Sequence, residues 1–281
     1  MSSSLHLLAD IRQSSERRPF SVLQLAEPLL NTNSVSATDD AYLVYEQVFI
    51  SAIDERQIEL AKALLLLLRK RFPASLRVKR LYGMINEAVG HPDEAQSIYT
   101  EMLATDPTNV LASKRLIALL KAAGHTDEAV AQLVAYLDTH SNDFEAWLEL
   151  AHLYMRNHRL AQAAFCLEEV ILQQPANHYF HLCYAELCYS MGRLDLALKE
   201  YLRVVELSTD NLRAFYGVKL VADRIRELRA RSKKDPALCI DDAPQPATLD
   251  RLAQLATERL VAIYSRANQV TKTTAELWLS S

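Results

Sequence analysis

Three side chains of the kinds that bind metal ions lie close together in the second half of the chain: His178, His181 and Cys183. The two histidines are three residues apart, so on a helix they would share one face. A protein zinc site needs further ligands at a fixed geometry, and the surrounding sequence suggests none. We therefore interpret both histidines as ordinary helix residues and expect neither a metal ion nor a cofactor.

Acidic side chains that could serve as general acids or bases also occur close together. Glu149 and His152 share one predicted helix, and Glu168 and Glu169 are neighbours on the next. Adjacent acids on a helix usually form a solvated face. The sequence contains no GxSxG, P-loop or HExxH motif. We therefore expect no enzymatic activity.

The composition points away from several other classes of protein. The net charge of −4 over 281 residues offers no basic face for nucleic acid. Only five glycines are present, which argues against sheet-rich folds and phosphate-binding loops. The four cysteines form no CxxC pair, and we expect buried, inert thiols in a reducing compartment. They are Cys166, Cys183, Cys188 and Cys239.

No segment of the sequence predicts membrane insertion or secretion. The most apolar run, ALLLLLRKRF at 63–72, is much shorter than the roughly 20 residues of a membrane-spanning helix. The first twenty residues lack the apolar core of a signal peptide. We therefore expect a chain that is not secreted and does not cross a membrane by itself.

A period of 34 residues organises the middle of the chain. One column at this spacing consists of alanines: Ala61, Ala95, Ala129, Ala163 and Ala197. A second column lies at predicted turns: Gly90, Gly124, His158 and Gly192. A third has Pro73, Pro107, Ser141, Pro175 and Thr209, and a fourth has Leu65, Tyr99, Leu133, Leu167 and Tyr201. Thirty-four is the period of the tetratricopeptide repeat, a helix-turn-helix unit.

The repeat predicts an all-α fold, a right-handed tetratricopeptide-repeat solenoid of about five helix-turn-helix units with flanking helices. The alanines lie where the two helices of a unit cross, and Trp147 is a packing residue. We divide the chain into a helical cap and polar loop (1–41), five repeats (42–211), a repeat-like helix (212–234), a loop rich in proline and acids (235–250), and a C-terminal capping helix and tail (251–281). The capping helix places Leu252, Leu255, Leu260 and Ile263 on one stripe.

The usable surface of a solenoid is its concave face, lined by the first helix of each unit. We expect the second, fifth, ninth and twelfth positions of each unit to point into this groove. The groove is then basic at its N-terminal end and more apolar and aromatic toward the C-terminus, which suits an amphipathic or extended protein segment. The candidate binding residues are Arg77, Arg80, Lys114, Lys121, Leu148, His152, Met155, Tyr179, Leu182, Tyr189 and Tyr216. The alternative is that several of them pack against neighbouring helices.

Five stretches of the repeats resemble one family, subunit 2 of the endoplasmic reticulum membrane protein complex. They are YEQVFISAID (45–54), RFPASLRVKRLYGM (71–84), YTEMLATDPTN (99–109), EAWLELAHLYM (145–155) and LAQAAFCLEEVILQQPANH (160–178). The resemblance weakens before residue 40 and from about residue 225 onward.

The resemblance implies a function that the repeats alone do not. Such subunits are non-catalytic scaffolds on the cytosolic face of the endoplasmic reticulum membrane, in a complex that inserts transmembrane segments, including those of tail-anchored proteins. It implies that the chain holds cytosolic segments of subunits 3 and 5, carries a soluble partner resembling subunits 8 and 9, and is peripheral to the membrane. The alternative from another class is a free tetratricopeptide adaptor that binds short peptides reversibly.

Overall fold

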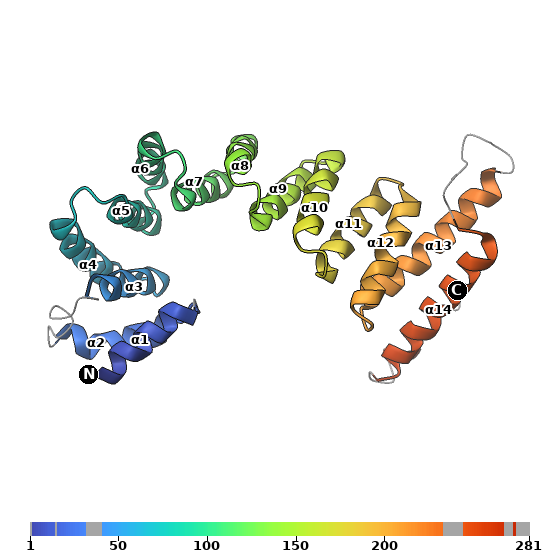
Figure 1. Cartoon of the computed structure of the whole chain (residues 1–281), viewed down its shortest axis with the longest axis horizontal. Helices are drawn as coiled ribbons and strands as arrows, with labels where there is room; N and C mark the ends of the chain where they lie inside the picture. Colours follow the sequence, from blue (N-terminus) through green and yellow to red (C-terminus); the bar gives the residue numbers. More distant parts are fainter. Residues whose placement is uncertain (1, 15, 32–40, 233–243, 267–271, 274–281) are drawn as a thin grey trace. The chain divides into compact units, whose positions relative to one another are not determined.

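The computed structural model describes residues 2–14, 16–31, 41–232, 244–266 and 272–273 (Figure 1). The described part contains helices and no strands. The helices of the first half are α1 (Ser2–Ser14), α2 (Pro19–Asn31), α3 (Ala41–Asp54), α4 (Ile58–Arg71), α5 (Leu76–Val89), α6 (Pro92–Thr105) and α7 (Val110–Ala122). Those of the second half are α8 (Thr126–Thr139), α9 (Phe144–Arg156), α10 (Leu160–Gln173), α11 (His178–Ser190), α12 (Leu194–Leu207), α13 (Leu212–Ser232) and α14 (Pro246–Tyr264).

The chain forms two compact units, Met1–Gln132 and Leu133–Ser281. Within the units, consecutive helices pack against one another, as in the pairs α3–α4, α5–α6, α9–α10 and α11–α12. This confirms the predicted all-α helical-repeat fold of the tetratricopeptide type. In the described part of the chain, no helix has both the length and the apolar character that a membrane span requires.

Five turns at the predicted period have the same backbone conformation. The residue with positive φ is Arg56, Gly90, Gly124, His158 or Gly192. In each turn the next residue donates its N–H to the carbonyl five positions earlier, which closes the helix end as a Schellman motif does. The glycine column is therefore a column of left-handed residues, and Arg56 extends it by one turn that composition alone did not reveal.

The alanine column lies where the helices of each pair approach most closely. All five of its alanines are fully buried, as expected for small side chains where two helices cross closely. At Gly83 even a methyl group would be too large, since a Cβ at this position would lie 2.5 Å from the ring of Tyr99. The bulky Tyr99 on α6 thus occupies the space that a side chain at Gly83 on α5 would need.

The helix at the C-terminal end differs from the prediction in start and register. It begins at Pro246 rather than at Arg251. Proline is favoured in the first turn of a helix, whereas the prediction assigned Pro246 to the loop 235–250. Its buried residues are Leu249, Ala253, Ala256 and Leu260, whereas Leu255 of the predicted stripe is 44% exposed. The small alanines let α14 pack closely along α13, beside which it lies in Figure 1. Cys239 and most of the predicted loop 235–250 lie outside the described residues.

Candidate functional site

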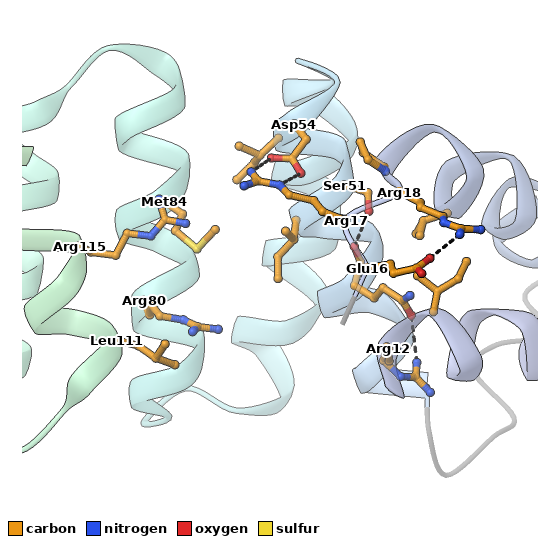
Figure 2. A pocket seen from close by; sticks show the side chains of 16 residues that line it. Arg12, Glu16, Arg17, Arg18, Ser51, Asp54, Arg80, Met84, Leu111 and Arg115 are labelled. Atoms are coloured by element: carbon orange, nitrogen blue, oxygen red, sulfur yellow. Dashed lines mark hydrogen bonds and ion pairs between the residues drawn. The ribbon is translucent and has the colours of Figure 1, made fainter. Parts of the chain in front are cut away.

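The most highly charged cavity of the first unit is lined by five arginines, and we refer to it as the arginine pocket. Its volume is about 500 Å³, within the ordinary range of ligand-binding pockets. The arginines are Arg12, Arg17, Arg18, Arg80 and Arg115. They come from α1, from the α1–α2 connection, from α5 and from α7, and α3 contributes Ser51 and Asp54 to the lining (Figure 2).

A buried carboxylate of α3, Glu46, pairs with Arg80 of the pocket lining. Glu46 is 8% exposed, accepts a hydrogen bond from Arg80 Nη2 at 2.9 Å and forms an ion pair with Arg77, whose Nε lies 2.5 Å away. The Nε atom of Arg80 is buried and has no hydrogen-bond partner. Burial lowers the pKa of Arg80. The nearby charge of Glu46 raises this pKa, and repulsion from Arg77 and Arg115 lowers it further. Arg80 is thus a buried cation that shares its one counterion.

A second carboxylate joins α5, α6 and α7. Glu87 accepts a hydrogen bond from the hydroxyl of Tyr99 and forms an ion pair with Arg115, whose Nη1 lies 3.3 Å away. Burial raises the pKa of Tyr99 strongly, and the hydrogen bond to Glu87 adds to this effect, so Tyr99 remains a neutral donor. Arg115 therefore also shares its carboxylate, here with a phenol.

The outer rim of the pocket has its own polar contacts. Arg17 forms a bidentate ion pair with Asp54, with Nε 2.9 Å from one carboxylate oxygen. Arg18 pairs with Glu16. Arg12, by contrast, donates to the neutral side-chain oxygen of Gln47 at 3.2 Å. Among the five arginines, Arg12 is thus the one bonded to an uncharged group.

The sequence-predicted residues of the first unit divide between pocket and surface. Arg80 lines the pocket, but its side chain is mostly buried in the ion pair with Glu46. Arg77 is exposed and shares that carboxylate from outside the pocket lining. Lys114 is half-buried and Lys121 is exposed, and neither lines the pocket.

Sequence reasoning missed Arg12, Glu46 and Arg115. Arg12 lies outside the repeats, and Arg115 occupies the sixth position of its unit, next to the fifth position assigned to the groove. One signal could have revealed Glu46: it lies one period of 34 residues before Arg80. Opposite charges at the same repeat position in consecutive units predict a contact between consecutive first helices.

In the second unit, the predicted binding residues differ widely in exposure. Tyr179 is 43% exposed, whereas Leu182 is 4% exposed and belongs to the core. The prediction that Leu182 points into an open groove is wrong, because the alternative of packing against neighbouring helices applies to it. His152 is exposed, and three others are half-buried. These three are Leu148, Met155 and Tyr189.

Tyr216 shows what the C-terminal helix contributes to this face. Its hydroxyl donates to the hydroxyl of Tyr264 on α14 at 3.2 Å, and the two rings meet edge to face. Arg266, just after α14, lies 3.4 Å from Asp210 in the α12–α13 connection. The end of α14 thus contacts Tyr216, a predicted binding residue, as well as the side of α13.

His181 has a structural role that explains its type and position. It is 6% exposed, its Nε2 donates to the carbonyl of Pro175 at 3.0 Å, and its Nδ1 lies 2.7 Å from a carboxylate oxygen of Glu200. Trp147 lies one period earlier and donates its ring N–H to the carbonyl of Ser141 at 2.8 Å. In both repeats, a ring N–H thus donates a hydrogen bond to the carbonyl six residues earlier. Among the described residues, no group of three His, Cys, Asp or Glu side chains is placed to hold a metal ion.

The three cysteines that the structure describes in the second unit lie inside or close to the core. Cys166 and Cys188 are buried and Cys183 is partly buried, all as free thiols. Burial raises the pKa of Cys166 to about 12 and also raises the pKa of Cys188. These thiols therefore stay protonated and are poor nucleophiles.

Comparisons with known proteins extend this description. The family model described as EMC2 TPR-like repeat domain matches residues 58–200. ER membrane protein complex subunit 2-A of Xenopus laevis is 40% identical over 230 residues, which cover 80% of this chain and 77% of that protein. TPR repeat protein oca3 of Schizosaccharomyces pombe is 33% identical, over 79% of this chain and 82% of that protein.

A solved structure supports the fold alone. The C-terminal part of a TPR repeat-containing protein from Cytophaga hutchinsonii superimposes with a TM-score of 0.61 at 13% identity. The match covers 96% of this chain and 97% of the other. The family itself rests on the sequence matches, and the family model covers the repeats that carry Trp147 and His181. By these matches the chain belongs to the family of subunit 2 of the endoplasmic reticulum membrane protein complex.

Proposed function

We propose that the chain is a non-catalytic scaffold subunit of the endoplasmic reticulum membrane protein complex. In this role it lies on the cytosolic face of the membrane and is attached through its partners. It holds cytosolic segments of the membrane-embedded subunits 3 and 5 and carries a soluble partner resembling subunits 8 and 9. The assembled complex inserts transmembrane segments, including those of tail-anchored proteins, into the membrane.

The observation that carries this proposal is the 40% identity over 80% of the chain to a protein named as subunit 2 of that complex. The fold supports it because helical repeats present a long surface made of side chains from many helices. Large exposed side chains are available for contacts in both units, such as Leu111 at 53% and Phe165 at 54% exposure. Exposed apolar groups of this size are common at protein interfaces.

The test is an affinity purification of the tagged chain from detergent-solubilised membranes, followed by a salt wash and quantitative mass spectrometry. We expect a fixed set of membrane proteins in amounts equal to the chain, among them subunits 3 and 5. Recovery of the chain alone, or with scattered substoichiometric cytosolic proteins, would contradict the scaffold and favour a free peptide-binding adaptor.

A further inference from the structure

The arginine pocket contains more positive charge than its own acids neutralise. Six arginines lie in or beside it, because Arg77 joins the five of the lining through Glu46. Four acids accompany them: Glu16, Glu46, Asp54 and Glu87. Two positive charges therefore remain in excess, on a chain whose overall charge is −4.

The excess charge lies on Arg12 and on Arg77 and Arg80, which share the single carboxylate of Glu46. The rim pairs Arg17–Asp54 and Arg18–Glu16 are balanced one to one. Arg12 is bonded to a neutral amide, and Arg80 has a buried Nε without a partner. Figure 2 shows the side chains of Arg80 and Arg115 extending from α5 and α7 toward the wall formed by α3. A carboxylate placed between Arg80 and Arg115 would gain charge-assisted hydrogen bonds in addition to those that the two arginines make with Glu46 and Glu87.

Apolar side chains lie directly beside these cations. Leu111 is one turn from Arg115 on α7, where it is 53% exposed, whereas Met84, one turn from Arg80 on α5, is only 6% exposed. Ile50 and Ile53 of α3 complete the apolar part of the lining. A free phosphate or a lipid headgroup would leave Leu111 uncovered, whereas a peptide with alternating acidic and apolar side chains would use both kinds of contact.

We propose that the arginine pocket binds an acidic, partly apolar segment of a partner protein, with its carboxylates on Arg12, Arg80 and Arg115 and an apolar side chain on Leu111. This proposal rests on the proposed function only for the identity of the partner. The binding chemistry is a property of the purified chain and can be tested without the complex.

The first experiment measures fluorescence anisotropy of a short labelled peptide built of glutamate, leucine and serine, titrated with the full chain. The variant is Arg12→Gln with Arg115→Gln, which spares the buried ion pair of Arg80. The matched control is Arg203→Gln with Arg224→Gln, two exposed arginines of the second unit that pair with Glu206 and Glu227 on their own helices. Both double variants remove the same charge, and circular dichroism verifies that each retains the helical fold.

We expect the glutamate peptide to bind the unmodified chain with an affinity that falls as salt rises. Each arginine removed should weaken binding about tenfold, as the loss of a charge-assisted hydrogen bond does, and the control pair should bind as the unmodified chain does. Three results would overturn the proposal: equal binding of a peptide with glutamine in place of every glutamate, unchanged binding by the pocket variant, or tighter binding of phosphatidylserine vesicles through the same arginines.

A second experiment examines the pocket in the assembled protein. Leu111→p-benzoylphenylalanine places a photo-crosslinker at the exposed edge of the pocket in the cell. We expect the crosslinked peptide to be rich in aspartate and glutamate, and crosslinks to lipid or to a basic segment would refute the inference. If the affinity purification fails but the glutamate peptide binds, the proposed function is wrong and the pocket chemistry stands.

Discussion

At the scale of single residues, Trp147 and His181 occupy the same position in consecutive repeats. The side chains differ, but the same hydrogen bond is made at both positions. Both rings donate an N–H to the carbonyl six residues earlier. A phenylalanine at either position keeps an aromatic ring and removes the donor. His181→Phe also leaves the carboxylate of Glu200 without its ring partner in a site where His181 is 6% exposed.

We expect His181→Phe to lower the free energy of unfolding by about 1–3 kcal/mol, the cost of unpaired buried polar groups. Trp147→Phe should cost about 0.5–1.5 kcal/mol, because the Ser141 carbonyl keeps a second donor, Gln173 Nε2 at 3.1 Å. Urea unfolding followed by circular dichroism measures both. Equal losses for the two variants would contradict a special role for the buried histidine.

The buried thiols yield a prediction about pH. Burial raises the pKa of Cys166 from about 9 to about 12 in the folded chain. At about pH 8 the thiolate fraction is then about a thousandfold lower than for an ordinary thiol, so iodoacetamide should modify this residue slowly in the native protein and rapidly in urea. Site-resolved mass spectrometry measures the two rates, and rapid native modification would refute the burial of Cys166.

The same pKa shift has a defined sign in the stability of the protein. The unfolded chain loses its thiol proton above about pH 9, whereas the folded chain retains it until about pH 12. The folded state therefore binds more protons in this window, and its stability is highest below about pH 9 and falls as pH rises. Replacing Cys166 by alanine should remove this contribution to the slope.

At the scale of elements, the five left-handed turn residues allow a test of how the helix pairs are closed. A non-glycine residue in this conformation costs about 1–2 kcal/mol, and glycine costs about 0.5–1 kcal/mol of unfolded-state entropy. His158→Gly and Arg56→Gly should therefore raise the free energy of unfolding by up to about 1 kcal/mol. Gly124→Ala, as the matched reverse change at φ +81, should lower it by a similar amount. Melting temperatures measure all three, and a loss in either glycine variant would show that its side chain contributes more than the strain costs.

Elements were predictable from the sequence where the period is continuous, because alanine, turn and proline columns each mark one feature of a helix pair. The predicted turns at Gly90, Gly124, His158 and Gly192 all adopt positive φ. The period fails beyond the last repeat, where Pro246 starts a helix that was interpreted as loop. A proline near acidic residues is compatible with a turn and with the start of a helix. Packing against α13 favours the helix.

The candidate site was less predictable than the fold, because long side chains do not follow positions on a helical wheel. Arg115 reaches the pocket from the sixth position of its unit, and Arg12 comes from a helix without the repeat. Leu182 has a groove position but packs into the core, since its neighbours on adjacent helices cover it. A repeat period fixes where backbones lie; which side chains reach a cavity depends on the packing of neighbouring elements.

At the scale of the whole molecule, the division after Gln132 has no counterpart in the sequence. It falls inside α8, in the middle of a repeat whose alanine and leucine columns continue unchanged. A continuous period gives each helix pair the same local contacts, and stability in such an array is a sum over repeats and their neighbours. A change at one end should therefore weaken the nearest helices and leave distant ones unaffected.

Deletion from Pro244 onward tests this locality, because it removes α14 and uncovers one side of α13. The residues that α14 buries against its neighbour are Leu249, Ala253, Ala256 and Leu260. We expect hydrogen exchange to accelerate strongly in α13, less in α12, and not in α3–α6 of the other unit. The point variant Leu260→Ala serves as the matched control, with a smaller effect on the same helices. If α13 kept its protection from exchange, α14 would not be the structural cap of the array. If protection fell equally in every helix, the molecule would unfold as one cooperative body. Partners bound at the two ends could then influence each other through it.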